Sequence, residues 1–357
     1  MRIYKISASE LDDGLRRRWR EIQGTNPSLR NPYFCPEYTE SVAAVRDDVF
    51  LGILEEQDGR VAGIFPFQMA TRHIAEPVGG RMSDYQGLIV SPGTECDAGE
   101  LLRGCGLKVW KFDHLLEDQA CFSGFHGVKD FSQAMDMSNG YDAYLAEKRK
   151  SGSRRLAQFQ RKGRKFEREV GAFRFETYST DEDAFEQVIA WKREQCIRTG
   201  APDFLGWGWT RALLERIWRI RNTHFSGMLS VLYHDETIIA AHFGMKSSTV
   251  CHWWFPTYNS EYSRYSPGGV LLLKLAESVA ADGITLVDLG KGKEEYKPSF
   301  SNYEIGLAEG TAFVPSPIAF LYKARQDSEQ FLRRSPYAER VKTPIRKVRR
   351  LLGKRSA

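Results

Sequence analysis

A strand pattern, a short loop and a marked helix start follow one another between residues 249 and 281. The apolar strand of residues 249–258 runs into "NSEYSRYSPGG", where Ser266 suits a helix N-cap and Pro267 suits the first helical position. Gly268 and Gly269 leave the first turn without side chains, so free backbone N–H groups and the helix dipole favour an anion there. Alternatively, Ser-Pro-Gly-Gly only turns the chain into a core helix, and the local residues leave both interpretations open.

The length and composition describe a globular protein of ordinary character. The chain has 357 residues, of which 42% are hydrophobic and 27% are charged, and this length suits two domains. The longest apolar runs, such as residues 238–241 and 270–273, are much shorter than the roughly 20 residues of a membrane span. The opening residues, "MRIYKISASELDDG", contain no apolar signal core. We therefore expect a cytoplasmic protein.

Cysteine usage fits a reducing compartment. Six cysteines are scattered along the chain without any C-x-x-C pair, which argues against a disulfide framework. Cys105 and Cys121 are close in sequence, but no histidine-rich ligand spacing accompanies them. We therefore expect no metal site.

The net charge of +5 conceals two strongly basic segments. Residues 147–169 hold ten Lys/Arg against three Glu, and residues 333–357 hold ten Lys/Arg against one Glu. The first segment suits an anionic partner. The second has a helical pattern and suits an anionic membrane surface, with cyclic di-GMP as another anionic partner and solvated disorder as the plain alternative. No helix-turn-helix or finger spacing accompanies either segment, so we expect no DNA binding.

The pattern of helices and strands predicts an α/β protein of four parts. A first α/β unit covers residues 1–140, a basic helical linker covers 141–170, a second α/β unit covers 171–325, and a basic tail covers 326–357. Both units share an outline of a helix followed by a hairpin, which hints at duplication. In the first unit, strands at 49–55 and 60–68 flank the turn Gln57-Asp58-Gly59.

Several individual elements can be placed more closely. Ser-Gly-Ser at 151–153 breaks the linker helix, and Thr180 is the expected N-cap of a helix at 181–199. A hairpin turn is expected at 234–236. Further strands are expected near 108–113, 120–125, 173–178, 285–288 and 303–307, with helices at 99–107 and 209–222.

Several motifs in order resemble the CelD-like and FemAB-like branch of the GNAT acyltransferase superfamily. This resemblance covers roughly residues 30–305, and its motifs are "PYFCPEY" (32–38), "SDYQGLIVSPG" (83–93), "WKREQCIRTGAPDF" (191–204), "AAHFG" (240–244), "HWWFPTYNSEYSRYSPG" (252–268) and "VDLGKGKEEYKPSF" (287–300). It implies mixed sheets in two tandem GNAT-like domains joined by the basic helical arm, the first domain being degenerate. The usual R/Q-x-x-G-x-G/A signature is replaced by "YSRYSPGG".

The resemblance also implies a donor and its contacts. The donor is acetyl-CoA or another acyl-CoA, with its pantetheine along the central strand at Trp254 and Phe255. Its pyrophosphate would lie at the helix start formed by residues Ser266, Pro267, Gly268 and Gly269.

Three side chains are candidates for the catalytic chemistry. Acyl transfer to an amine needs a base, donors for the oxyanion and a proton for the leaving thiolate. Tyr296 stands where the fold often keeps its thiolate-protonating tyrosine, although it can simply pack in the core. Asp288 can position or deprotonate the amine, or only cap the turn before Gly290. His242 is the other candidate base, although a lone histidine on a strand is more often structural.

Acceptor binding is expected from a second group of residues. The family pattern W-x-x-x-Q-x-x-x-T-G-x-x-D is matched within the motif at 191–204 and implies an acceptor groove. The candidate substrate-binding residues are Trp191, Arg193, Gln195, Asp203, Tyr258 and Lys297.

The resulting hypothesis is an acetyl-CoA-dependent N-acyltransferase. Its acceptor would be an amino sugar or lipid-linked saccharide in bacterial exopolysaccharide synthesis, and it would be cytoplasmic or peripheral at the inner membrane. Two alternatives remain open. One is a Fem-type transferase that uses aminoacyl-tRNA, and the other is a non-catalytic regulator that binds a nucleotide or membrane within a polysaccharide synthase complex.

Overall fold

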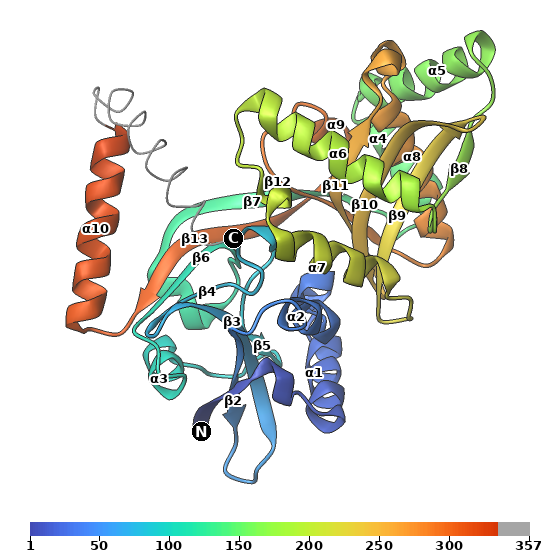
Figure 1. Cartoon of the computed structure of the whole chain (residues 1–357). Coiled ribbons are helices and arrows are strands. Elements are labelled where there is room, and N and C mark those ends of the chain that lie inside the picture. The colour runs from blue at the N-terminus through green and yellow to red at the C-terminus, as the bar shows by residue number, and fades with distance from the viewer. Residues whose placement is uncertain (335–357) are drawn as a thin grey trace.

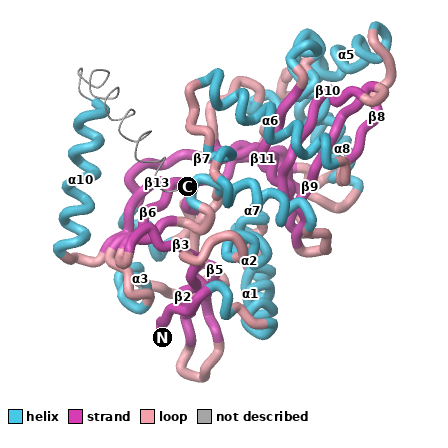
Figure 2. Tube along the Cα trace, in the orientation of Figure 1, coloured by secondary structure: helices cyan, strands magenta, loops and turns pink. Residues whose placement is uncertain are grey.

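The fold is a mixed α/β architecture built on one long sheet (Figure 1). The computed structural model describes residues 1–334. Thirteen strands join in the order β1-β2-β3-β4-β6-β13-β7-β12-β11-β10-β9-β8, with β5 paired to β3. Figure 2 shows this sheet running through both halves of the molecule with helices on its faces. The mixed α/β class expected from the sequence is confirmed, with one continuous sheet in place of separate ones.

The first half contains seven strands and three α-helices among the described residues. Its helices are α1 (Asp13–Thr25), α2 (Pro36–Ala43) and α3 (Ala98–Gly104). Its strands are β1 (Arg2–Ser7), β2 (Val49–Glu55), β3 (Val61–Thr71), β4 (Ile74–Glu76), β5 (Ile89–Val90), β6 (Val109–Leu116) and β7 (His126–Asp136). Short 3-10 turns include η2 (Pro27–Leu29), η3 (Pro32–Phe34), η4 (Gly80–Met82) and η5 (Ala120–Phe125).

The second half follows two linking helices, α4 (Tyr141–Lys150) and α5 (Arg154–Glu169). Its helices are α6 (Glu182–Thr199), α7 (Gly208–Arg219), α8 (Pro267–Ala281), α9 (Lys297–Phe300) and α10 (Pro317–Arg334), with the 3-10 turn η6 (Phe204–Gly206) before α7. Its strands are β8 (Arg174–Glu176), β9 (Phe225–His234), β10 (Thr237–Ser247), β11 (Val250–Tyr258), β12 (Leu286–Lys291) and β13 (Tyr303–Phe313).

The two halves exchange strands at the centre of the sheet. β13 comes late in the chain, yet it lies between β6 and β7 and pairs antiparallel with both. β7 in turn pairs with β12. Backbone hydrogen bonds therefore run without a gap from one half to the other. The domain boundaries given by the sequence stay a prediction.

Helices cover both faces of the sheet and bury three apolar clusters. The first cluster joins the two halves, with Trp19 from α1, Val42 from α2 and Ile217 from α7 all fully buried. The second lies under α4, α5 and α8, and the third lies under α3 and η5. Because the first cluster holds residues of both halves, the space between the halves is fixed by apolar packing.

Most of the turns, helix breaks and helix starts predicted from the sequence are confirmed. The structure agrees with the sequence-based predictions for the hairpin turns at Gly59 and Asp235. It also agrees for the break at residues 151–153 and for the start of α8 at Pro267. Two local expectations were wrong. Residues 120–125, predicted as a strand, form η5, and the strand begins only at His126. The N-cap of α6 is Asp181 and not Thr180, and its carboxylate accepts a hydrogen bond from the Ala184 N–H.

The basic tail predicted from residue 326 onward can be followed only in part. Residues 326–334 continue α10, and the remainder of the tail lies outside the described residues. Within the described part of the chain, no helix is both long and apolar enough to cross a membrane.

Candidate active site

A gap opens in the sheet where two parallel strands stop pairing. β11 and β12 pair at Val250–Leu286, Cys251–Val287 and His252–Asp288. Beyond His252 and Asp288 the strands continue to Tyr258 and Lys291 without further pairing to each other. The backbone groups that face this gap are therefore free of ladder hydrogen bonds between these two strands. The last paired residues, His252 and Asp288, lie at its base.

The His252 ring is held between two carboxylates. Its Nδ1 lies 2.9 Å from Asp288 Oδ2, and its Nε2 lies 3.0 Å from Asp84 Oδ2. The side chains of His252 and Asp288 are fully buried, whereas that of Asp84 is 29% exposed. Asp84 is therefore the member of this trio that a ligand can reach.

Asp288 is fixed by hydrogen bonds from distant parts of the chain. Asn31 Nδ2 donates to its Oδ2 over 2.8 Å, and the Ser132 hydroxyl donates to its Oδ1 over 2.5 Å. The Gly290 N–H donates to the same Oδ1 over 3.0 Å, in a turn with φ of +76° that glycine tolerates best. A buried carboxylate with this many donors is held in one orientation.

His252, Asp288 and Asp84 stabilise one another's charged forms. Burial alone would lower the pKa of His252, but Asp288 and Asp84 raise it to about 9. Burial would raise the pKa of Asp288, yet the His252 ring holds it below its usual value, and the pKa of Asp84 is lowered for the same reason. At neutral pH the site thus holds an imidazolium between two carboxylates.

Aromatic rings from the first half enclose the buried side of His252. Tyr33 meets the imidazole edge-to-face at 5.1 Å between centroids, and Tyr85 does so at 6.3 Å. Tyr33 also packs edge-to-face on Trp254 at 5.7 Å. These rings exclude water from the His252–Asp288 pair, which strengthens the electrostatic coupling between them.

Lys297 lies beside the same gap and is buried. Its ammonium donates to the carbonyls of Gly290 and Lys291, at 3.0 and 3.1 Å, and pairs with Glu294 at 2.9 Å. It therefore holds the end of β12 in place. The sequence predicted a substrate contact for Lys297, which stays a prediction; the described contacts are to the backbone and to Glu294.

His242, the other candidate base, lies on β10. It is fully buried, its ring stacks on Trp253 at 4.1 Å, and its Nε2 accepts the Trp254 N–H over 3.2 Å. Burial lowers the pKa of His242 to about 3, so the ring is neutral. It fills an irregularity in the β10–β11 ladder between Phe243 and Met245. A structural role accounts for all of these contacts.

Tyr296 occupies the N-cap position of α9, just beyond the gap. Its ring is half-buried and lies edge-to-face with Phe300 at 6.3 Å between centroids. Burial raises the pKa of its hydroxyl, so Tyr296 keeps its proton at neutral pH. A protonated hydroxyl can donate to a leaving thiolate, and this role stays a prediction.

The start of α8 differs from the prediction that the Ser266 side chain caps the helix. Ser266 takes the N-cap position in a left-handed conformation with φ of +52°, and its side chain does not cap the helix. Its hydroxyl accepts instead from the Lys162 ammonium of α5 over 2.8 Å. A Cβ on Gly269 would lie 2.6 Å from Phe159, and one on Gly268 would lie 3.6 Å from Tyr258. The first turn is thus walled by two aromatic rings and has a lysine beside it.

The residues expected to bind the acceptor lie mainly at the end of α6. Arg193 pairs with Asp203 over 3.0 Å, and the Asp203 carboxylate caps η6 by accepting the Gly206 N–H over 3.1 Å. Both side chains therefore shape the turn after α6. Gln195 is exposed and Trp191 is half-buried on the same helix.

The three expected contacts on β11 differ in exposure. Trp254 and Phe255 are buried and stack at 4.5 Å, so only their backbone can face the gap freely. Tyr258 at the end of β11 is 49% exposed and can meet a ligand.

Sequence reasoning missed the residues that complete the trio. It proposed His242, not His252, as the candidate base and gave no role to Asp84, Asn31 or Ser132. Asp84 does lie in the motif "SDYQG", and an acidic residue flanked by a serine and a tyrosine in a loop was the one available signal.

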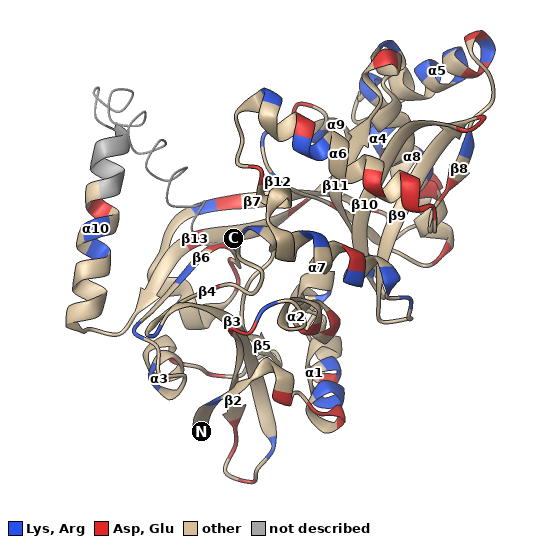
Figure 3. Cartoon of the chain, viewed as in Figure 1, with Lys and Arg blue, Asp and Glu red and all other residues tan. Residues whose placement is uncertain are grey.

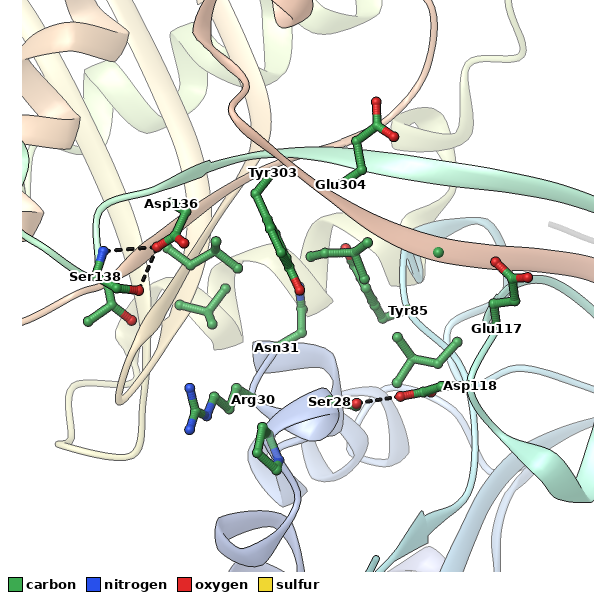
Figure 4. A pocket seen from close by; sticks show the side chains of 17 residues that line it. Ser28, Arg30, Asn31, Tyr85, Glu117, Asp118, Asp136, Ser138, Tyr303 and Glu304 are labelled. Carbon is green, nitrogen blue, oxygen red and sulfur yellow. Dashed lines mark hydrogen bonds between the residues drawn. The ribbon is translucent and has the colours of Figure 1, made fainter. Parts of the chain in front are cut away.

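A cavity of about 650 Å³ approaches the trio from the other end of the strands (Figure 4). It is lined by the starts of β11 and β12 at Val250 and Leu286, and by Tyr303 of β13. Asn31 and Tyr85 also line it. Since Asn31 bonds to Asp288, one side chain separates this cavity from the buried carboxylate.

Comparison with known proteins gives a family match for one segment of the chain. Residues 153–298 match the family of the acetyltransferase (GNAT) domain. This segment runs from α5 to α9 and includes the gap between β11 and β12. This part of the chain is thus similar to GNAT acetyltransferase domains. His252, Asp288, Tyr296 and Lys297 lie within the GNAT domain, whereas Asp84 and Asn31 lie outside it.

Solved structures resemble almost the whole chain, beyond the GNAT domain alone. FemX superposes with a TM-score of 0.58 at 10% identity, over 89% of this chain and 99% of FemX. The C-terminal domain of a putative lysylphosphatidylglycerol synthetase from Agrobacterium fabrum gives 0.52 at 13% identity, over 87% and 94%. A tandem GNAT protein from the clavulanic acid biosynthesis pathway gives 0.50 at 13%, over 88% and 99%. These likenesses confirm the fold. A search of functionally curated proteins gave no match.

The raised pKa of His252 predicts a pH dependence of stability. An imidazole with a pKa near 6.5 when unfolded and about 9 when folded stabilises the native state fully below pH 6.5. This contribution is lost as pH rises through 9. We expect the free energy of unfolding to fall by on the order of 3 kcal/mol between pH 6.5 and 9.5. Urea titrations across this range measure it.

The matched controls for this experiment are two histidine variants. His252→Gln should flatten the profile, whereas His224→Gln, at an exposed histidine, should leave it unchanged. If the free energy of unfolding fell equally with pH in His252→Gln and in the unmodified protein, the raised pKa of His252 would be contradicted.

Proposed function

We propose that the protein transfers an acyl group, acetyl in the simplest case, from an acyl-CoA to the amine of an amino-sugar acceptor. One observation carries the proposal: the His252 ring, bracketed by Asp84 and Asp288, lies where β11 and β12 separate. In this arrangement the partly exposed Asp84 takes the amine proton, and His252 and Asp288 hold its carboxylate in place.

The reaction balances with these groups alone. A C–N bond forms between the acceptor amine and the acyl carbon, and the C–S bond of the thioester breaks. Asp84 accepts the proton that the amine loses, and the thiolate takes a proton for which Tyr296 is our candidate donor. The Lys297 ammonium stands beside the gap and adds positive charge where the carbonyl oxygen becomes negative.

The corner at α8 supports a phosphate-bearing donor. α8 is 15 residues long and has no side-chain cap, so its dipole and first-turn N–H groups favour an anion. Lys162 adds a cation at that point through its contact with Ser266. The ring of Phe159 against Gly269 and that of Tyr258 near Gly268 form apolar walls.

An amino-sugar or lipid-linked saccharide acceptor is favoured by exposed aromatic and basic side chains of the second half and of α5. Tyr258 and Trp207 are 49% and 44% exposed, and aromatic faces of this kind suit sugar rings. Arg154, Arg161 and Arg164 of α5 are exposed and suit an acceptor's phosphates. Figure 3 shows blue bands along this helix. Synthesis of a cell-surface polysaccharide is the pathway that we propose on this basis.

A thermal-shift titration tests the donor. Stabilisation by acetyl-CoA supports an acyl-CoA donor. Indifference to acetyl-CoA together with binding of aminoacyl-tRNA would favour the Fem-type alternative, to which the FemX-like fold and the basic α5 lend support. Indifference to both would favour a non-catalytic regulator, with cyclic di-GMP as the probe to add next.

Replacing Lys162 should weaken the binding of acyl-CoA. A charge-assisted contact of this kind contributes about 1.5–3 kcal/mol, so Lys162→Ala should raise the Kd of acetyl-CoA about tenfold or more. Isothermal titration calorimetry measures the constant. Lys165→Ala is the matched control, because Lys165 is exposed on the same helix and pairs only with Glu169 among the described residues. Equal losses in the two variants would count against a phosphate site at this corner.

A further inference from the structure

Helix α10 stands apart from the other helices at the edge of the first half (Figure 1). It follows β13 and touches the rest of the chain along one side only. Ala319, Tyr322 and Gln326 face a cavity of about 580 Å³ that β6 and β13 line from below. Gln326 lies 3.5 Å from the Thr311 hydroxyl of β13. Among the described residues, the opposite side of α10 carries exposed side chains.

The solvent side of α10 begins with large apolar residues. Phe320 is 74% exposed, Leu321 is 67% exposed and Ile318 is 36% exposed, all within four consecutive residues. Val128 of β7 is 57% exposed and lines the cavity beneath the helix. Single exposed apolar residues are ordinary, but a continuous cluster on one turn marks an interaction surface.

Positive charge accompanies this apolar turn. Lys323 and Arg325 lie within the next four residues of the helix. Lys323 borders the cavity, and its ammonium lies 5.6 Å from the centre of the Phe313 ring. The sequence that continues from α10 is strongly basic, because residues 333–357 hold ten Lys/Arg and one Glu. In Figure 3 the start of α10 carries no charged residue, and blue bands and then a red band follow along the helix.

We propose that α10 docks on an anionic lipid surface, with Ile318, Phe320 and Leu321 inserted among the headgroups. An apolar helix face with Lys/Arg beside it is the pattern of helices that lie in a membrane interface. The basic residues that follow are attracted to anionic lipids. Such docking needs no spanning helix, and the described residues contain none.

The charge favours lipid over a second copy of the chain. In a two-fold dimer through α10, the same surface would face itself, and the Lys/Arg residues that follow its apolar turn would be brought together. Their repulsion would oppose pairing, whereas anionic headgroups neutralise both. An acidic protein partner would use the same charges, and the experiment below separates that outcome from lipid binding.

Vesicle flotation with the full chain tests the proposal. We expect binding to vesicles of phosphatidylglycerol and phosphatidylcholine in equal parts, and at least about tenfold weaker binding to phosphatidylcholine alone. Phe320→Ser with Leu321→Ser should reduce the first binding by about tenfold or more, because two large apolar side chains no longer insert. Both positions are exposed, so the midpoint of thermal unfolding should stay unchanged.

Controls make each outcome decisive. Ile197→Ser, at a residue of α6 that is 73% exposed, should bind vesicles like the unmodified protein. Wild-type binding by the Phe320→Ser/Leu321→Ser variant would overturn the proposal, and so would equal binding to both vesicle types. A protein that fails to float but forms a dimer, with the dimer lost in that variant, would assign the surface to a second copy. If the protein stays monomeric and does not bind vesicles, lipid is rejected and a protein partner is left as the occupant of this surface.

Discussion

Replacing Asp84 by asparagine is expected to lower kcat for acyl transfer roughly a hundredfold or more, with little change in the Kd of acyl-CoA. General base catalysis contributes about 10²–10⁴ in rate, and Asp84 is the reachable carboxylate of the trio. The amide keeps the shape of the side chain and can still contact His252. Steady-state kinetics with an amine acceptor, paired with calorimetry for the donor, measures both quantities.

The control for Asp84 is Asp47→Asn, at an exposed aspartate of the same half. It should keep full activity. A modest loss in Asp84→Asn, similar to that in Asp47→Asn, would remove Asp84 from the chemistry. A large loss accompanied by weaker donor binding would instead assign it to positioning of the substrate.

Replacing Asp288 by asparagine is expected to lower the free energy of unfolding by about 3–5 kcal/mol at pH 7. The variant leaves a buried imidazolium without its nearest anion, 2.9 Å away in the native protein. It also replaces an acceptor of the Ser132 and Gly290 hydrogen bonds with a poorer one. Chemical denaturation monitored by circular dichroism provides the measurement.

A double-mutant cycle separates the charge pair from simple loss of packing. Adding His252→Gln to Asp288→Asn removes the unpaired charge, so the double variant should be more stable than the sum of the single effects predicts. Ser132→Ala, which removes one neutral donor, should cost only about 1 kcal/mol. Strict additivity of His252→Gln and Asp288→Asn would show that the pair does not interact as described.

Much of the fold could be predicted because its signals are local. Pro267 at the start of α8, Gly59 in the first hairpin and Gly152 between α4 and α5 each restrict the backbone at one position. The failure at residues 120–125 has a physical reason as well. That apolar run forms η5 because Phe122 packs into the third cluster, and a short apolar run suits a turn as well as a strand.

The candidate site was harder to predict. The chemical role of each residue in it depends on neighbours in the folded structure, which the local sequence does not contain. His242 and His252 are two residues of the same kind on neighbouring strands. One meets a backbone N–H and an indole ring, and the other meets two carboxylates. Their pKa values of about 3 and about 9 follow from those neighbours alone.

The sequence by itself determined the mixed α/β class, the basic arm, the start of α8 and the likeness to GNAT acyltransferases. Each of these depends on residues close together in the chain, whose backbone preferences and charges act over one or two turns. Only the tertiary structure decided the site, since Asp84 reaches His252 across 168 positions and Asn31 reaches Asp288 across 257. Those contacts exist because β13 and β7 join the halves in one sheet and a shared apolar cluster closes the space between them.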